Sequence, residues 1–249
     1  MCTLTIFSYE KDRSFLIAFN RDELKIRKIA YPPSFYEFRG IKQLYPKDAE
    51  SGGTWIGIND LGFAFVLLNY NQKGLYKNYA TNPVYLNKKS RGFIIPPLLE
   101  FSTETEILQA MKTLPYEQFS PFRLIFFNPH KQKIHALIYT GRGKKYREYC
   151  LPFFQASSGI GDLKMYPIRK RLFKEFLKNP TSSKQQIRFH HYYNKKKPSN
   201  GILMNRKLAH TVSQSFILLK EKKVYFHYKD VIQKKKYKYQ MTLKTPIAL

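Results

Sequence analysis

The first two dozen residues constrain the fold of this chain more than any other segment. Residues 3–9 and 14–19 consist largely of β-branched, aromatic and aliphatic side chains, which favour β-strands. Only four residues, all of them charged, separate the two segments, so the pattern predicts an antiparallel hairpin closed by a tight turn. The second strand leads into a polar segment, Asn20-Arg21-Asp22-Glu23.

The register of this hairpin decides which side chain lies beside Cys2. If the two residues that flank the turn face each other, Cys2 faces Arg21, whereas a one-residue slip brings Asn20 or Asp22 opposite the thiol. Directly opposed Cβ atoms lie roughly 5 Å apart, so every register places the thiol beside polar or charged groups. Taken singly, the same residues are also typical of an inert packed cysteine and a solvated ion pair.

The position of Cys2 suits an N-terminal nucleophile. Cysteine is small enough for Met1 to be removed, and the freed α-amino group would have a pKa of about 7.7–8.0, beside a thiol with a pKa of about 8.5. Such an amine can act as the general base for the thiol of its own residue. The Arg21 cation would favour the thiolate, and Asp22 could hold the amine or the arginine in position.

Two sequence motifs carry a resemblance to a known family. Met-Cys-Thr at residues 1–3, followed by Asn-Arg-Asp-Glu at residues 20–23, resembles the NRDE family, also called the transport-and-Golgi-organisation type. The Gly-Gly-Thr-Trp-Ile-Gly segment at residues 52–57 resembles the next block of that family. The family is assigned to the N-terminal-nucleophile hydrolase superfamily. Its blocks extend to about residue 219, which implies one domain over residues 1–249.

The resemblance also implies the fold class, α+β, as a four-layer αββα sandwich with two stacked antiparallel sheets between helices. The residue pattern by itself predicts hairpins interleaved with helices. Residues 24–50 are expected to form a loop with a short extended piece, because Tyr31-Pro32-Pro33 interrupts regular structure. A capping box at residues 103–106 predicts the start of a helix, and a later helix is expected over residues 168–178.

Related hydrolases suggest further site residues. The strand that ends at Asn69 resembles a strand of conjugated bile salt hydrolases and penicillin V acylases, where an asparagine helps form the oxyanion hole. Ser158 stands where those acylases have a second oxyanion asparagine, and Arg206 could match their late active-site arginine. A strand-end amide and a turn-forming serine are the plain alternatives. The catalytic candidates are Cys2, Arg21, Asp22 and Asn69, and the candidate substrate contacts are Asn20, Trp55, Ser158, His191 and Arg206.

Composition limits the partners. The formal net charge of +27 is compatible with an anionic membrane surface, an anionic substrate or nucleic acid, and equally with a lysine-rich solvated surface. The lysine clusters match no nucleic-acid motif, so nucleic acid ranks last. The two distant cysteines suggest a reducing, cytoplasmic setting, and no signal peptide or membrane-length apolar run is present. No zinc-ligand spacing occurs, so neither a metal nor another cofactor is expected.

These features lead to one main expectation and one alternative. The main expectation is a cysteine N-terminal-nucleophile hydrolase that acts on a non-peptide linear amide in a small, anionic or lipid-like substrate. The alternative is a non-catalytic carrier of a lipid-like or haem-like ligand, or a membrane-trafficking protein. The resemblance implies this alternative, because members of the family have been linked to haem mobilisation and membrane organisation.

Overall fold

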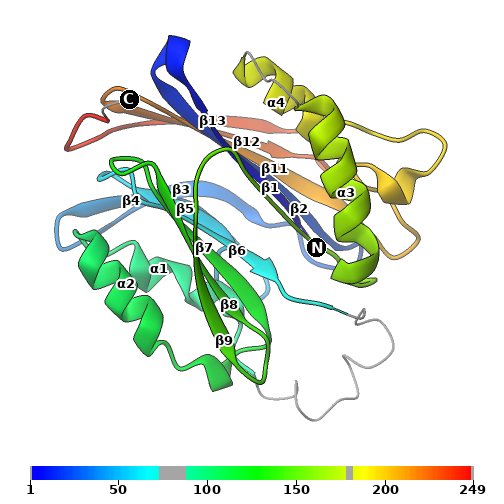
Figure 1. The fold of residues 1–249 in the computed structure, drawn as a ribbon, viewed down its shortest axis with the longest axis horizontal. Coiled ribbons are helices and arrows are strands. Elements are labelled where there is room, and N and C mark those ends of the chain that lie inside the picture. The colour runs from blue at the N-terminus through cyan, green and yellow to red at the C-terminus, as the bar shows by residue number, and fades with distance from the viewer. Residues whose placement is uncertain (1, 73–87, 178–181, 248–249) are drawn as a thin grey trace.

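Two antiparallel β-sheets stack face to face, and helices cover the outer face of each (Figure 1). The computed structural model describes residues 2–72, 88–177 and 182–247. The first sheet contains, in spatial order, β10 (Phe153–Ser157), β1 (Cys2–Tyr9), β2 (Ser14–Leu24), β11 (Ala209–Lys220), β12 (Lys223–Asp230) and β13 (Lys236–Thr242). The second contains β3 (Tyr31–Phe38), β4 (Ile41–Lys47), β5 (Ile56–Asn59), β6 (Ala64–Asn69), β7 (Phe122–Asn128), β8 (Lys133–Tyr139) and β9 (Lys144–Tyr149).

The helices form the two outer layers. α3 (Asp162–Phe176) and α4 (Ser183–His190) cover the first sheet, and α1 (Ile95–Leu98) and α2 (Glu104–Thr113) cover the second. Short 3₁₀ turns occur at η1 (Glu10–Asp12), η2 (Arg91–Phe93), η3 (Tyr116–Gln118) and η4 (Pro198–Asn200). α2 begins with the expected capping box, in which the Thr103 and Glu106 side chains bond each other's backbone N–H. The expected four-layer αββα sandwich is confirmed.

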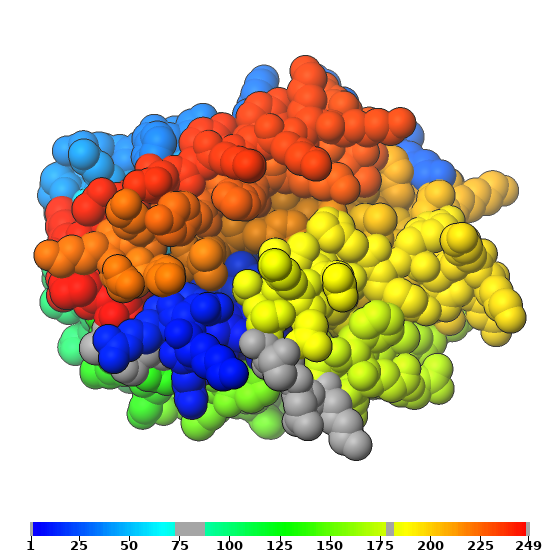
Figure 2. Space-filling model, turned by 90° about the horizontal axis from the view of Figure 1, so that it is seen from above, coloured from blue at the N-terminus to red at the C-terminus, as the bar shows by residue number. Residues whose placement is uncertain are grey.

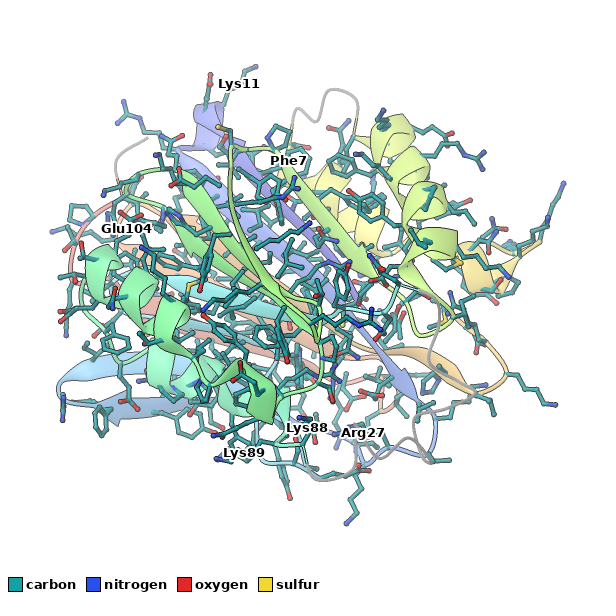
Figure 3. The ribbon with its side chains drawn as sticks, turned by 60° about the horizontal axis from the view of Figure 1, so that its bottom comes forward. Phe7, Lys11, Arg27, Lys88, Lys89 and Glu104 are labelled. Carbon is teal, nitrogen blue, oxygen red and sulfur yellow. The ribbon has the colours of Figure 1, made fainter. Side chains whose placement is uncertain are left out.

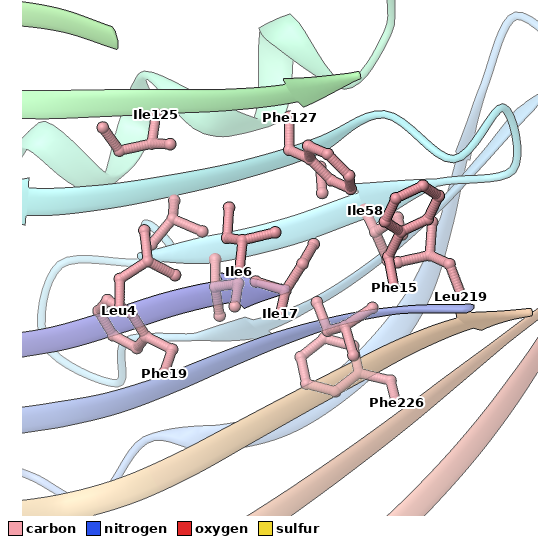
Figure 4. Close-up of a cluster of buried hydrophobic side chains, with 14 of the residues drawn as sticks. Leu4, Ile6, Phe15, Ile17, Phe19, Ile58, Ile125, Phe127, Leu219 and Phe226 are labelled. Carbon is pink, nitrogen blue, oxygen red and sulfur yellow. The ribbon is translucent and has the colours of Figure 1, made fainter. Parts of the chain in front are cut away.

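The largest hydrophobic core lies between the two sheets. Alternate residues of each strand point into it, as strand geometry requires. Leu4 and Phe19 come from the first sheet and Ile125 and Phe127 from the second, and Figure 4 shows their side chains between the sheets. Cys2 belongs to the same inward-facing row, so the fold places its side chain between the sheets and not toward the helices.

The first hairpin pairs in the register that places Cys2 opposite Arg21. On its other side, β1 pairs with β10, so that Cys2 also lies opposite Ser157. β11 pairs with the edge of β2 that does not face β1. Distant parts of the sequence therefore meet around the N-terminal strands, and Figure 2 shows the dark blue hairpin beside the yellow α4 region and the orange and red C-terminal strands.

Two sequence expectations are wrong. Residues 24–50 contain two strands: β4 includes the short extended piece expected near residues 42–45, whereas β3 lies where a loop was expected. β3 is an edge strand with a register shift at its prolines, and an edge strand tolerates residues that lack a donating N–H. The α3 helix begins at Asp162 and not at residue 168, because tertiary bonds hold its start: Asn71 O accepts from Asp162 N–H at 2.6 Å. Residue 178, the expected helix end, lies outside the described residues.

Within the described residues, no helix combines the length and the apolar character needed to cross a bilayer.

Candidate active site

A small cavity, about 100 Å³ in volume, opens where β1 begins and β2 ends. In Figure 3 this end of the molecule, marked by Arg27, lies opposite the hairpin tip that carries Lys11. The cavity is lined by Cys2, Arg21, Asp22, Glu23, Arg27, Asp48, Ser51, Gly53, Thr54, Trp55, Leu67, Asn69, Ser90, Arg91 and Gly92. All four expected catalytic residues, together with Trp55, therefore line one cavity.

Strand alternation divides the Asn20–Glu23 segment between two layers. Arg21 and Glu23 lie on the inward face with Cys2, whereas the side chains of Asn20 and Asp22 bond groups of the helical layer. Arg21, Asp22 and Glu23 all line the cavity, and Asp22 has a second task. Together with Asn20, it attaches the helices and β11 to the sheet.

Arg21 is held on three sides. Its guanidinium carbon lies 3.9 Å from the centre of the Trp55 ring, which gives a cation–π contact in a buried setting. One Nη atom donates to the Asp48 carboxylate, and Glu23 lies 3.7 Å away. A guanidinium stacked and paired in this way has one orientation, so its positive charge stays fixed at the cavity wall.

Asp48 is the acidic centre of this wall. It accepts from Arg27 at 2.8 and 2.9 Å, in addition to Arg21, and its Oδ1 accepts from the N–H of Ser51 at 2.8 Å. Burial alone would raise the Asp48 pKa, but the hydrogen bonds from Arg27 and the charge of Arg21 hold that pKa well below its usual range. The Asp48 carboxylate is therefore ionised at neutral pH and fixes both arginines.

A close contact between two glycines builds the opposite wall. A Cβ on Gly53 would lie 2.5 Å from the carbonyl carbon of Gly92, so only glycine allows the two backbones to approach this closely. The N–H of Thr54 donates to Gly92 O at 3.0 Å. The Gly-Gly-Thr-Trp segment thus places Trp55 under Arg21 and fixes the η2 turn beside the cavity.

A hydrogen bond from Arg123 fixes the backbone of Asn69. Its carbonyl oxygen accepts from Arg123 at 2.9 Å, and the same guanidinium nitrogen lies 2.7 Å from Asp162 at the start of α3. The end of β6 is therefore tied to the opposite half of the sandwich, and Asn69 stays at the cavity in a fixed place.

A buried ion pair supports the start of β1, where Cys2 lies, from the helical side. Arg169 of α3 and Asp22 are both fully buried and lie 2.9 Å apart. Arg169 also donates to Thr3 Oγ1 at 2.9 Å and to the carbonyl oxygen of Cys2 at 3.3 Å, and Asp22 accepts from Thr211 at 2.6 Å. This cluster joins the start of β1, the end of β2 and the start of β11.

The surroundings of Cys2 favour the neutral thiol. Burial raises the pKa of the Cys2 thiol, and the negative charge of Asp22 adds to this effect. A hydrogen bond from the Asp22 backbone and the charge of Arg21 act in the opposite direction without reversing the shift. A thiol in this state requires a nearby base before it can attack.

Four expected substrate contacts lie outside the cavity lining. Asn20 is buried behind the sheet, where it donates to the carbonyl oxygens of His190 and Ile202 at 2.9 and 3.0 Å. His191 is exposed and lies against Phe216 on the outer face of the first sheet. Strand alternation and the position of α4 explain both placements.

The other two residues meet each other. Arg206 Nη1 donates to Ser158 Oγ at 3.3 Å, and the Ser158 N–H donates to Asp162 at 2.6 Å. Ser158 follows Ser157, the partner of Cys2 across β1 and β10, so this pair lies beyond the strand end and not on the cavity wall.

Sequence reasoning did not identify Arg27, Asp48, Arg91 or Arg169. No local motif marks these residues, because each acquires its role through contacts made by folding. The short spacing from Arg21 to Arg27 was the one available signal for a second cavity arginine. In the described part of the chain, no three histidine, cysteine, aspartate or glutamate side chains are grouped so that they could hold a metal ion.

The two stacked sheets between helical layers are the fold of N-terminal-nucleophile hydrolases. Solved structures with a similar fold include the following two. An N-acylethanolamine-hydrolyzing acid amidase ortholog from Caenorhabditis elegans has a TM-score of 0.60 and 15% identity, covering 87% of this chain and 92% of that chain. A mutant of conjugated bile acid hydrolase from Clostridium perfringens has a TM-score of 0.58 and 13% identity, covering 97% and 92%.

The sequence identifies the family. Residues 1–242 match the model of the family described as Transport and Golgi organisation 2, and the chain belongs to that family. A comparison with curated protein sequences gives no match.

Proposed function

We propose that this protein is a cysteine N-terminal-nucleophile hydrolase of the NRDE type that cleaves a non-peptide linear amide. The observation that carries this proposal is the convergence of Cys2, Arg21 and Asn69 on one cavity. The amidase and bile acid hydrolase with the same fold support the reaction class. A small, anionic or lipid-like substrate suits a cavity whose walls are rich in arginine.

The reaction begins with proton transfer within one residue. Removal of Met1 exposes the α-amine of Cys2, which accepts the thiol proton, and the sulfur then attacks the amide carbonyl carbon. The negative charge on the carbonyl oxygen is stabilised by the side-chain amide of Asn69 and a backbone N–H, each contributing roughly 3–4 kcal/mol. The Arg21 charge favours the thiolate that forms during this step.

The second half of the reaction releases both products. The C–N bond breaks as the α-ammonium returns its proton to the leaving nitrogen, and a thioester remains on Cys2. Water then attacks the thioester carbonyl while the amine accepts its proton. The C–S bond breaks, the carboxylic acid leaves, and the thiol regains a proton.

The first test is the intact mass of the untagged protein. The proposal requires loss of one methionine, since an amine in a peptide bond cannot act as the base. Retention of Met1 on every molecule would contradict the mechanism.

The second test compares the two cysteines, Cys2 (buried) and Cys150 (exposed). With an N-acylethanolamine and a glycine-conjugated amide as substrates, Cys2→Ala should lower turnover by about 10⁴-fold or more. Cys150→Ala is the matched control and should keep wild-type turnover. Unchanged circular dichroism of Cys2→Ala separates lost chemistry from lost folding, and full activity of that variant would end the hydrolase proposal.

A different surface supports the carrier alternative as a second candidate. Ile26, Leu208, Ile29 and Ile232 are exposed by 89, 61, 43 and 40%. They form an apolar rim, because the Lys25 N–H donates to Leu208 O at 3.0 Å, and Ile29 and Ile232 line one neighbouring pocket.

Lysines surround this apolar rim, and Lys25 and Lys28 line the same pocket. Exposed apolar side chains among cations suit an anionic bilayer, to which each nearby lysine contributes about 1 kcal/mol. The wild type and the Cys2→Ala variant should therefore float with phosphatidylserine vesicles, whereas Ile26→Asp/Leu208→Asp should not. Phe93→Asp, which replaces an apolar side chain outside the rim, is the control. Equal flotation of all four proteins would argue against membrane binding through the apolar rim.

A further inference from the structure

Three arginines line the active-site cavity, and they differ in how their charge is balanced. Arg21 and Arg27 share Asp48, and both lie within 4 Å of Glu23. Arg27 also pairs with Glu50 at 3.4 Å. The positive charges of Arg21 and Arg27 are thus paired with carboxylates of the cavity wall and its surroundings.

Arg91 has no such partner. It forms no ion pair with any described residue, and the undescribed ranges 73–87 and 178–181 contain no aspartate or glutamate. The remaining acid of the lining, Asp22, is paired with Arg169 on the far side of the sheet. The half-buried Arg91 is therefore the arginine of the cavity lining whose guanidinium has no carboxylate within ion-pair distance among the described residues.

The backbone under Arg91 is rigid. Arg91 precedes Gly92, whose backbone is locked against Gly53 and accepts from the Thr54 N–H. The side chain is also restrained, since Nη1 donates to Pro121 O at 3.0 Å. A guanidinium carries five N–H donors in a planar fork, so donors remain that this carbonyl does not use.

We propose that Arg91 binds a carboxylate group of the substrate and so selects anionic amides. A planar carboxylate matches the guanidinium fork and provides the ion-pair partner that Arg91 lacks among the described residues. Because Cys2 and Arg91 line the same cavity of about 100 Å³, one small ligand that fills it can contact both residues. As a statement about substrate class, this inference rests on the proposed hydrolase function, but carboxylate binding can be measured without turnover.

The fluorescence of Trp55 can report ligand binding in the cavity. Trp55 is the single tryptophan of the sequence, and it lines the cavity. In the Cys2→Ala background, where no amide is consumed, Trp55 fluorescence is titrated with N-acetylglycine and with its uncharged counterpart N-(2-hydroxyethyl)acetamide. Arg91→Gln should weaken N-acetylglycine binding by about 10- to 100-fold and change binding of the uncharged amide by less than about three-fold.

Two further variants separate a specific contact from general charge. Lys88→Gln removes one positive charge three residues away, from a side chain that donates to Glu117 O and does not line the cavity, and it should leave both affinities unchanged. Arg91→Lys keeps the charge without the fork and should recover part of the affinity. Circular dichroism and urea unfolding check that each variant is folded.

Several outcomes would overturn the inference. These are no Trp55 response to N-acetylglycine, an equal loss of affinity for both probes in Arg91→Gln, or an equal effect of Lys88→Gln. The two proposals can fail separately. If the protein binds carboxylates through Arg91 but hydrolyses no amide, the hydrolase proposal is refuted and the carboxylate site stands. If it hydrolyses amides at a rate that depends neither on Arg91→Gln nor on substrate charge, the carboxylate site is refuted and the hydrolase proposal stands.

Discussion

The two faces of the segment Asn20–Glu23 perform different tasks. On the inward face, Arg21 lies over Trp55 at the wall of the cavity that contains Cys2. On the outward face, Asn20 and Asp22 bond His190 and Arg169 of the helical layer. A four-residue signature on a strand is therefore two interleaved pairs. Arg21 and Glu23 face the cavity, whereas Asn20 and Asp22 bond the helical layer, and Asp22 lies at the cavity as well.

Arg21 and Arg169 extend this comparison, because each is a buried arginine that pairs with an aspartate. Arg169 and Asp22 are both fully buried, whereas Asp48 is bound by two arginines, Arg21 and the partly exposed Arg27. Removing Arg169 therefore takes a fully buried cation from Asp22, while removing Arg21 leaves Arg27 paired with Asp48. Stability should therefore depend on the outward arginine, and chemistry on the inward one.

The largest effect is expected for Arg169→Met. The substitution removes a fully buried cation that lies 2.9 Å from the buried Asp22 carboxylate, and the free energy of unfolding should fall by about 3–5 kcal/mol. Urea unfolding at pH 7 measures this loss. The double variant Arg169→Met/Asp22→Asn should lose less than the single variant, because no buried charge remains, and a single-variant loss below about 1 kcal/mol would contradict the argument.

A smaller loss of stability is expected for Arg21→Met. Arg27 still donates two hydrogen bonds to Asp48, so the free energy of unfolding should fall by only about 1–2 kcal/mol. Under the proposed mechanism, hydrolysis should nevertheless fall by about 10²-fold, since a fixed positive charge beside Cys2 is lost. If Arg21→Met and Arg169→Met lower the free energy of unfolding equally, the two faces do not differ in their contribution to stability.

Local parts of the site could be predicted from the sequence, and the long-range parts could not. The pairing of Cys2 with Arg21 follows from a short turn and strand alternation, both of which are local. The pairing of Asp22 with Arg169 spans 147 residues, and nothing near either residue signals it. Proline-containing β3 was missed because the sequence does not show which strand will lie at a sheet edge.

The same limit explains why some expected substrate contacts lie outside the cavity lining. The sequence predicts His191 as a pocket residue, but the buried member of the His190-His191 pair is His190, which bonds Asn20 and Thr5 at 3.0 and 2.8 Å. Asn20 Oδ1 can only accept, so Nδ1 of His190 donates and Nε2 accepts the Thr5 hydroxyl proton. This network uses the neutral imidazole, and a second proton would break it.

The smallest expected effect tests the outward face through pH. Burial lowers the His190 pKa from its ordinary 6.5 to about 3, so below pH 6.5 the unfolded chain binds a proton that the folded protein does not. The stabilising contribution of the neutral imidazole is complete above pH 6.5 and is lost progressively as pH falls toward 3. Between pH 7 and pH 6 this group alone should lower the free energy of unfolding by somewhat less than about 1 kcal/mol.

His190→Gln supplies the matched comparison for that slope. The variant is expected to be less stable at pH 7, because it disturbs the bonds to Asn20 and Thr5, yet its stability should fall less steeply from pH 7 to pH 5 than that of the wild type. All other titrating groups are common to both proteins, so the difference between the slopes belongs to His190. Urea unfolding at pH 7, 6 and 5 measures both slopes. Parallel slopes would mean that the outward face is not held by a neutral histidine, and the distinction between the two faces would then rest on the Arg169–Asp22 pair alone.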